Sequence, residues 1–420
     1  MVNADGKLRN FSKLNWEVIT SINSENSPLE RSTGTWSPLG PLSYTNGNSG
    51  YNGGLGRVNV IAFHPTDANI IYVGVPAGGL WKTTDGGSTW TPMSDSLASL
   101  GVSGIAVDHN NPNTVYILTG DGDGGDTQSI GVMKSTDGGS TWSATGLSWD
   151  VTNFNRGYKL MMHPTNSSIM FAVTTVGILK TTDGWASWTN VQSGSFRDVE
   201  FKPGNTSILY ASTTNTFYRS TNSGSSFSII SSGLPTGENR SELGVSPANS
   251  NYVYYLSGPA GSNSYKGLYR STDSGLTFSA MSTTPNILGY STSGNGSSSQ
   301  SWYDLAIAVN PTNASNTITG GVNLWRSTNG GATNSCITNW SEPSGSYEYV
   351  HADIHELVYN SVDNKLYCGS DGGISVSSDN GVNWTNIWDG LQIMQFYKIA
   401  GVENNQNLLV GGAQDNGSNK

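Results

Sequence analysis

The sequence TTDGGSTW at residues 83–90 returns almost unchanged as STDGGSTW at residues 135–142. Related copies recur along the chain at intervals of roughly 40 to 55 residues, a spacing typical of proteins built from repeated supersecondary units. The acidic or amide residue of the pattern occurs at Asp85, Asp137, Asp183, Asn222, Asp273, Asn329 and Asp379.

Each copy follows three short apolar or alternating runs and precedes a fourth. In the first repeat the three runs are 58–63, IIYVGVP at 70–76 and LWKTT at 80–84, separated by Pro, Asn, Asp and Gly. Such runs are typical of β-strands joined by hairpins, and four strands per repeat indicate a propeller blade. The sequence therefore predicts an all-β propeller of about seven four-stranded blades. Residues 396–402 and 407–417 add a partial blade.

The seven pattern residues are expected to be structural. An Asp or Asn side chain accepts hydrogen bonds from backbone N–H groups of its own turn, and Gly supplies a positive φ. We therefore interpret them as turn formers rather than catalytic groups. Residues 1–35 are expected to form an N-terminal arm, and residues 36–420 the propeller.

The charge composition disfavours some classes of binding partner. The formal net charge is −10, and only 12% of residues are charged. Because nucleic acids and anionic membranes are bound through Lys and Arg, both are disfavoured as partners. No apolar run approaches the roughly 20 residues that span a bilayer, so no membrane insertion is expected.

The repeats, together with the motifs GRVNVIAFHP, TGDGDGGD, HADIHEL, GSDGGI and GGAQDNG, carry a family resemblance. The repeats resemble the Asp-box (BNR) repeats of sialidases, sortilin-type receptor domains and xyloglucan-cleaving propeller enzymes. The whole stretch resembles secreted Bacteroidota-type propeller proteins, similar to the sortilin N-terminal propeller and labelled glycosyl hydrolases. The resemblance implies a secreted or cell-surface location and a place within a larger secreted protein. It also implies an extracellular polysaccharide or protein as partner.

Sialidases and xyloglucanases each require particular residues in the first blade. Sialidases need three arginines around the substrate carboxylate, and Arg57 is the only arginine at a comparable place in the first blade. The xyloglucanases resembled here carry an acidic residue two positions before a Gly-Gly in the first blade, where this chain has Pro76. Asp371, in SDGGI, keeps an acidic residue before Gly-Gly late in the chain and is a catalytic candidate.

A glycine-rich acidic loop is the first candidate site outside the repeat pattern. Asp121, Asp123 and Asp126 lie within GDGDGGD at 120–126, directly after an expected strand. Carboxylate oxygens on such a loop suit Ca²⁺, which is a candidate cofactor. The alternative is an acidic, solvated loop.

A second candidate is His351-Ala352-Asp353-Ile354-His355. On a strand, residues two apart share a face, so His351, Asp353 and His355 would project together into the channel and could bind Zn²⁺ or a similar metal. The alternative is a hydrogen-bonded channel lining.

The third candidate is Trp302-Tyr303-Asp304, after a polar loop that precedes an expected innermost strand. The two aromatic rings could stack on sugars, with Asp304 bonding to hydroxyls. Arg57 is the other candidate ligand-binding residue. The alternative is that both rings pack between blades.

Three functions follow from these features. The leading hypothesis is a non-catalytic module that binds an extracellular glycan or protein. The first alternative is a glycoside hydrolase using two carboxylates among Asp121, Asp123, Asp304, Asp353 and Asp371, roughly 5 to 9.5 Å apart. The second alternative is a structural spacer of a larger surface protein.

Overall fold

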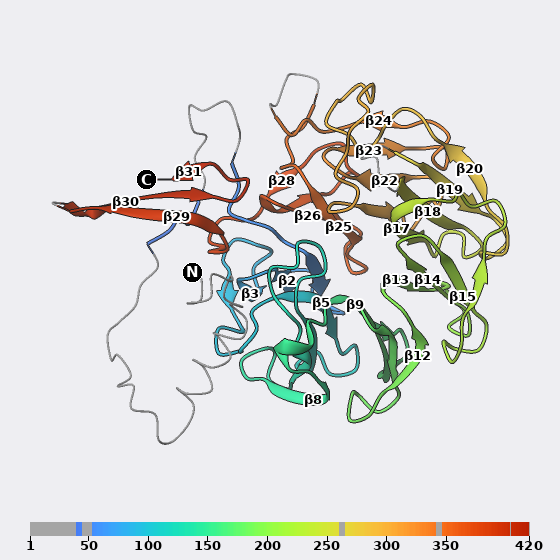
Figure 1. The fold of residues 1–420 in the computed structure, drawn as a ribbon, viewed down its shortest axis with the longest axis horizontal. Coiled ribbons are helices and arrows are strands. Elements are labelled where there is room, and N and C mark those ends of the chain that lie inside the picture. The colour runs from blue at the N-terminus through green and yellow to red at the C-terminus, as the bar shows by residue number, and fades with distance from the viewer. Residues whose placement is uncertain (1–38, 44–52, 260–264, 342–346, 404, 420) are drawn as a thin grey trace, which may run out of the picture.

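The computed structural model describes residues 39–43, 53–259, 265–341, 347–403 and 405–419. Seven four-stranded antiparallel sheets form a ring in this part of the chain, which confirms the predicted propeller (Figure 1). The one helical element among the described residues is the 3-10 turn Val151–Asn153. The proposed arm at 1–35 lies outside the described residues.

The blades follow one another in chain order, and each contains four consecutive strands. Blade 1 contains β1 (Val60–Phe63), β2 (Ile71–Val75), β3 (Gly79–Thr83) and β4 (Thr91–Pro92). Blade 2 contains β5 (Val102–Val107), β6 (Val115–Thr119), β7 (Gly131–Ser135) and β8 (Ser143–Ser148). Blade 3 contains β9 (Gly157–His163), β10 (Asn166–Thr174), β11 (Gly177–Thr181) and β12 (Thr189–Ser193). Blade 4 contains β13 (Phe196–Phe201), β14 (Leu209–Thr213), β15 (Phe217–Ser220) and β16 (Ser228–Ile230).

The remaining blades repeat this order. Blade 5 contains β17 (Glu238–Val245), β18 (Val253–Pro259), β19 (Gly267–Ser271) and β20 (Ser279–Ser282). Blade 6 contains β21 (Ala306–Val309), β22 (Thr317–Gly320), β23 (Leu324–Ser327) and β24 (Ser335–Cys336). Blade 7 contains β25 (Ile354–Tyr359), β26 (Leu366–Ser370), β27 (Gly373–Ser377) and β28 (Thr385–Asn386).

The first strand of every blade is the innermost. Each first strand contacts the first strand of the next blade, and β1 contacts β25 to complete the circle. At this joint Leu55 N–H donates to Gly372 O at 2.9 Å, and Val58 N–H donates to Ser370 O at 3.0 Å. Segments from opposite ends of the sequence therefore lie side by side, as the blue and orange-red ribbons show (Figure 1).

The hydrophobic core lies between the blades rather than in a single centre. One cluster joins blades 1 and 7, with Val73 and Ile374 fully buried, and another joins blades 1 and 2 through Leu80 and Ile117. A blade exposes apolar residues on both faces of its sheet, so each must be covered by two neighbours.

The repeated turns connect the third and fourth strands. In the first one, Asp85 Oδ1 accepts from Thr83 Oγ1 at 2.7 Å and from Thr89 N at 2.9 Å. Hydrogen bonds from Thr89 and Thr83 lower the pKa of Asp85 to about 2. The Trp90 Nε1–H donates to Ile387 O of blade 7 at 2.9 Å. The carboxylate is thus engaged by its own turn, and the indole connects that turn to the neighbouring blade 7.

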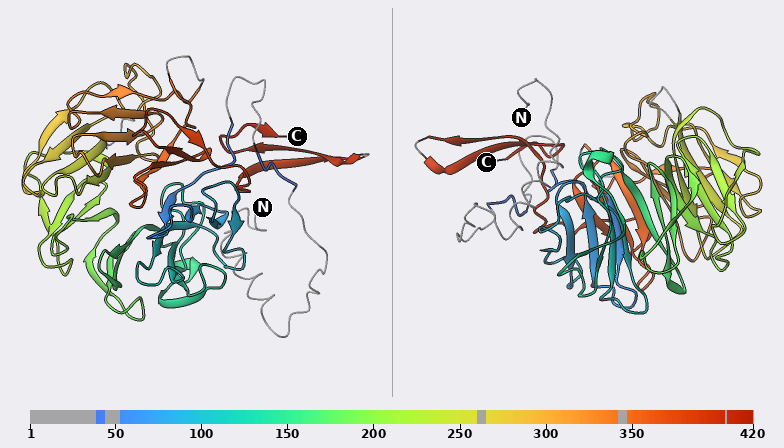
Figure 2. Two further views of the ribbon diagram at one scale, coloured as in Figure 1. Left: turned by 180° about the vertical axis from the view of Figure 1, so that it is seen from behind. Right: turned by 60° about the horizontal axis from the view of Figure 1, so that its bottom comes forward.

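The partial blade stands apart from the ring. The strands β29 (Phe396–Val402), β30 (Asn405–Ala413) and β31 (Ser418–Asn419) form a separate three-stranded sheet. It projects beside the joint of blades 1 and 7, and the turn between β30 and β31 returns to the ring (Figures 1 and 2). No helix in the described residues is long and apolar enough to cross a membrane.

Candidate active site

A cleft of about 940 Å³ lies at one end of the propeller channel. In each blade, the turn between strands 2 and 3 lies at the same end as the connection to the next blade. Tyr303 and Asp353 are in such connections, Arg57 precedes β1 at the same end, and Asp371 is in the β26–β27 turn. The repeated turns join strands 3 and 4 and therefore occupy the opposite end. The topology thus separates the structural motif from the cleft.

Asp371 is buried and surrounded by donors. His355 Nε2 lies 2.8 Å from Asp371 Oδ1, and Tyr303 Oη donates to Oδ2 at 2.9 Å. Arg57 Nη1 donates to the same Tyr303 Oη at 2.8 Å. Burial alone would raise the pKa of Asp371, but His355 and the charge of Arg57 lower it below its usual value. Asp371 is therefore ionised at neutral pH.

His355 lies between two carboxylates. Its Nδ1 is 2.9 Å from Asp123 Oδ2, while its Nε2 faces Asp371. Burial lowers the pKa of His355, but these two carboxylates outweigh it and raise the pKa to about 9. Both ring nitrogens therefore carry protons near neutral pH, and the imidazolium fixes Asp371 in place.

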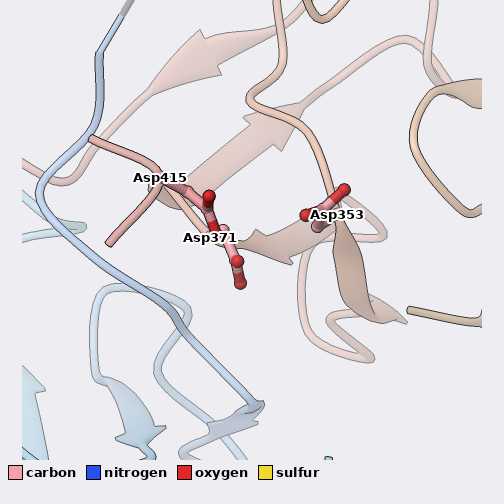
Figure 3. Close-up of side chains that lie close together, drawn as sticks. All are labelled: Asp353, Asp371 and Asp415. Atoms are coloured by element: carbon pink, nitrogen blue, oxygen red, sulfur yellow. The ribbon is translucent and has the colours of Figure 1, made fainter. Parts of the chain in front are cut away.

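Asp353 has the opposite character. Burial and the nearby charge of Asp371 raise its pKa to about 7, and Gln300 Nε2 donates to its Oδ1 at 2.8 Å. Asp353, Asp371 and Asp415 lie so close that one oxygen from each falls within 4.8 Å of the others (Figure 3). The cleft thus contains one carboxyl group that holds its proton up to about pH 7 and another that has lost it.

These three carboxyl groups are the set that could approach a metal ion in the described part of the chain. Asp371 is already engaged by His355 and Tyr303, and Asp353 by Gln300. The opposite pKa shifts of Asp353 and Asp371 are what an acid and a base require. At a suitable pH such a pair can donate a proton from Asp353 and accept one at Asp371.

The acidic loop at 120–126 is held by arginines. Arg57 Nη2 lies 2.7 Å from Asp121 Oδ2 and 2.9 Å from Asp126 Oδ2, and Arg240 Nη1 lies 2.8 Å from Asp123 Oδ1. One oxygen of each of the three carboxylates is thus paired with a guanidinium group. The loop carboxylates balance the positive charges of these arginines.

The expected grouping of His351, Asp353 and His355 on one strand face does not form. The strand β25 begins only at Ile354, and Asp353 has φ 64°, which breaks the alternation that the prediction assumed. His355 faces Asp123 and Asp371, whereas His351 Nε2 lies 3.2 Å from the carbonyl oxygen of Asp415. The three side chains therefore do not converge on one point.

The third candidate is placed as expected only in part. Trp302 is 50% exposed and lines the cleft, so the prediction that it faces a ligand agrees with its position. Tyr303 also lines the cleft but points its hydroxyl at Asp371. Asp304 is fully buried and so does not reach ligand hydroxyls. The alternative of two rings packed between blades does not hold for Trp302.

Several cleft residues were not identified from the sequence. Tyr290 and Trp340 form an edge-to-face pair on the cleft wall, with 6.3 Å between their ring centroids. Gln395 also lines the cleft, and its side chain donates a hydrogen bond to Asp126 at 2.8 Å. Asp415, in the motif AQDNG, comes from the β30–β31 turn. Each lies in a connection rather than a strand, and only the ring geometry brings them together.

The chain resembles xyloglucanases in sequence. No family model matches it. It is 30% identical to a xyloglucanase of Acetivibrio thermocellus over 132 residues, which is 29% of this chain and 16% of that protein. The chain thus matches only about a sixth of that relative's length.

Solved structures of xyloglucanases resemble this chain in fold. The GH74 xyloglucanase of Xanthomonas campestris superposes with a TM-score of 0.66 at 18% identity, covering 87% of this chain and 59% of that one. The GH74 enzyme of Niastella koreensis gives 0.61 at 22%, with 87% and 59% covered. This chain is a seven-bladed propeller resembling those of the xyloglucanases.

Proposed function

We propose that this protein is a glycoside hydrolase that cleaves a xyloglucan-like polysaccharide in the cleft. The observation that carries the proposal is the pair Asp353 and Asp371, whose pKa values are driven apart by their surroundings. Hydrolysis of a glycosidic bond ordinarily needs one protonated and one ionised carboxyl group. A glycoside hydrolase is the first alternative that the sequence suggests, and it fits the named relatives better than the non-catalytic binding module does.

In the proposed reaction Asp353 is the acid. It gives its proton to the oxygen of the leaving sugar as the glycosidic bond breaks. Asp371 is the ionised partner that either activates water or attacks the anomeric carbon. The two choices differ in the separation of the carboxyl groups, about 5 Å for attack and about 6.5 to 9.5 Å for an intervening water. The first-formed anomer, observed by NMR, distinguishes them.

Aromatic side chains supply the sugar-binding surface. Trp302, Tyr290 and Trp340 line the cleft, and the first two are about half exposed. Exposed aromatic faces pack against the C–H faces of pyranose rings, while charged groups bond to hydroxyls. A polysaccharide partner and an extracellular location are parts of this proposal, and cell fractionation tests the location.

The test is release of reducing sugar from xyloglucan by the purified protein, with cellulose and mixed-linkage β-glucan as comparison substrates. Wild type should release sugar, and Asp353→Asn and Asp371→Asn should not. Asp95→Asn, at an exposed site outside the cleft, is the matched control. Binding of xyloglucan without release by wild type would instead favour the non-catalytic module.

Calcium on the acidic loop stays a prediction. A rise in melting temperature with added Ca²⁺ that is lost in Asp126→Asn would support it, and the pairing of Asp126 with Arg57 argues against it.

A further inference from the structure

Asp304 is a buried carboxyl group without a donor. It lies two residues before the start of β21 and is fully buried. Neither of its oxygens meets an N–H or O–H donor within the described residues. A carboxylate in such a place would carry a charge with no hydrogen bond to replace water, which is strongly disfavoured. The site therefore favours the neutral acid.

The neighbours of Asp304 connect it to the proposed acid. Asp304 N–H donates to the backbone oxygen of Gln300 at 3.0 Å, and the side chain of Gln300 donates to Asp353. The carboxyl groups of Asp304 and Asp353 lie within hydrogen-bonding reach of each other, so a proton on either one can be shared between them. Gln300 thus contacts the backbone of Asp304 and the side chain of Asp353.

The charged groups that face Asp304 are already paired elsewhere. Arg240 binds Asp123, and His355 lies between Asp123 and Asp371. Both cations lower the pKa of Asp304, yet burial and the charge of Asp353 raise it well above the usual value. Tyr290, the other titratable group within electrostatic reach, is neutral at the pH of interest.

We propose that Asp304 is a positioning residue that keeps its own proton and donates it in a hydrogen bond to the carboxyl group of Asp353. Its role in catalysis rests on the proposed hydrolase function, whereas the placement of its proton does not.

The hydrogen bond acts when Asp353 reacts. The proton of Asp353 passes to the glycosidic oxygen, the bond from that oxygen to the anomeric carbon breaks, and Asp353 becomes a carboxylate. The Asp304 O–H and the Gln300 N–H then both donate to the new anion. Because hydrogen bonds to a charged acceptor are stronger than neutral ones, the pair stabilises the transition state more than the bound substrate. The proton of Asp304 is not consumed.

Two substitutions separate donation from packing. Asp304→Asn keeps the size and an N–H donor, whereas Asp304→Leu keeps a similar size without any donor. We expect kcat on xyloglucan to fall about ten- to a hundredfold in the Leu variant and to stay near wild type in the Asn variant. KM should change little in both. The alkaline limb of the pH profile should move upward in the Leu variant, because the Asp353 anion has lost a donor.

Equal losses in the two variants with unshifted pH profiles would overturn the role in catalysis. A second measurement does not need activity: infrared difference spectra of wild type against Asp304→Asn near pH 8. Wild type should show the carbonyl band of a protonated carboxyl group that the variant lacks, and its absence would overturn the proton placement. If the band is present but wild type releases no sugar, the proposed function fails and the proton placement stands. If the Leu variant does not fold, the infrared comparison decides.

Discussion

His355 and Asp371 form a buried pair in which 2.8 Å separates Nε2 from Oδ1. The pair joins the proposed base to a second carboxylate, Asp123, on the far side of the imidazole. The charge state of the cleft is therefore set by residues of blades 2 and 7 together. The charges of His355 and its two carboxylate partners should therefore affect both the stability of the fold and the activity.

Replacing His355 should destabilise the fold in a pH-dependent manner. The folded pKa of His355 is about 9, above its usual 6.5, so its contribution is fully present below pH 6.5 and is lost as pH rises through about 9. We expect His355→Gln to reduce the free energy of unfolding by on the order of 3 kcal/mol at pH 6 and by much less at pH 10. Urea denaturation at both pH values measures this. Equal losses at the two pH values would contradict it.

The pH profile of hydrolysis should end near neutrality. The active form needs Asp353 protonated, with a pKa of about 7, and Asp371 ionised, with a pKa below its usual value. We expect kcat/KM to be high on the acid side and to fall tenfold for each pH unit above about 7. A plateau extending to pH 9 would show that Asp353 is not the acid.

Asp371→Asn should remove the ionised partner while keeping its shape. We expect kcat to fall by a factor of about 10² to 10⁴ if Asp371 is a general base, which is the usual contribution of such a group. The fall should be larger if Asp371 is a nucleophile. The charge of Asp371 also raises the pKa of Asp353, so residual activity should show its alkaline limb at lower pH. Steady-state kinetics from pH 4 to 9 test both effects, with Asp95→Asn as the control.

Trp302→Ala should weaken substrate binding. Half of this side chain is exposed in the cleft, and stacking of an aromatic ring contributes about 0.5 to 1.5 kcal/mol. We therefore expect KM for xyloglucan to rise about three- to tenfold, with kcat less affected. Tyr397→Ala, an exposed aromatic on the projecting β29 strand, is the matched control and should leave KM unchanged.

Gly54→Ala should open the joint between blades 1 and 7. A Cβ atom at Gly54 would lie 2.1 Å from Cα of Gly372 and 2.4 Å from its carbonyl oxygen, and these backbone atoms leave it no room. We expect a loss of more than about 3 kcal/mol in the free energy of unfolding. Gly296→Ala, where a Cβ meets nothing within 4 Å, should leave the melting temperature unchanged.

The fold could be predicted because the same signals recur in every repeat. The strand-like runs, the turn residues and the spacing all indicate the same four-stranded blade. The site could be predicted only by residue type. Asp353 and Asp371 were candidates, but their proximity depends on the positive φ of Asp353, which reverses the side-chain alternation of an ordinary strand. The pairing of Arg57 with Asp121 likewise arises from ring geometry, which sequence distance does not reveal.

The joint of blades 1 and 7 has a consequence for the timing of function. Arg57 approaches from blade 1 and Asp371 from blade 7, and Tyr303 bridges them. In a molecule whose ring has not closed, individual hairpins can be complete while these side chains remain far apart. Contacts between segments distant in sequence are slow to form. Under the proposed function, hydrolysis would then begin only after the joint between blades 1 and 7 has closed.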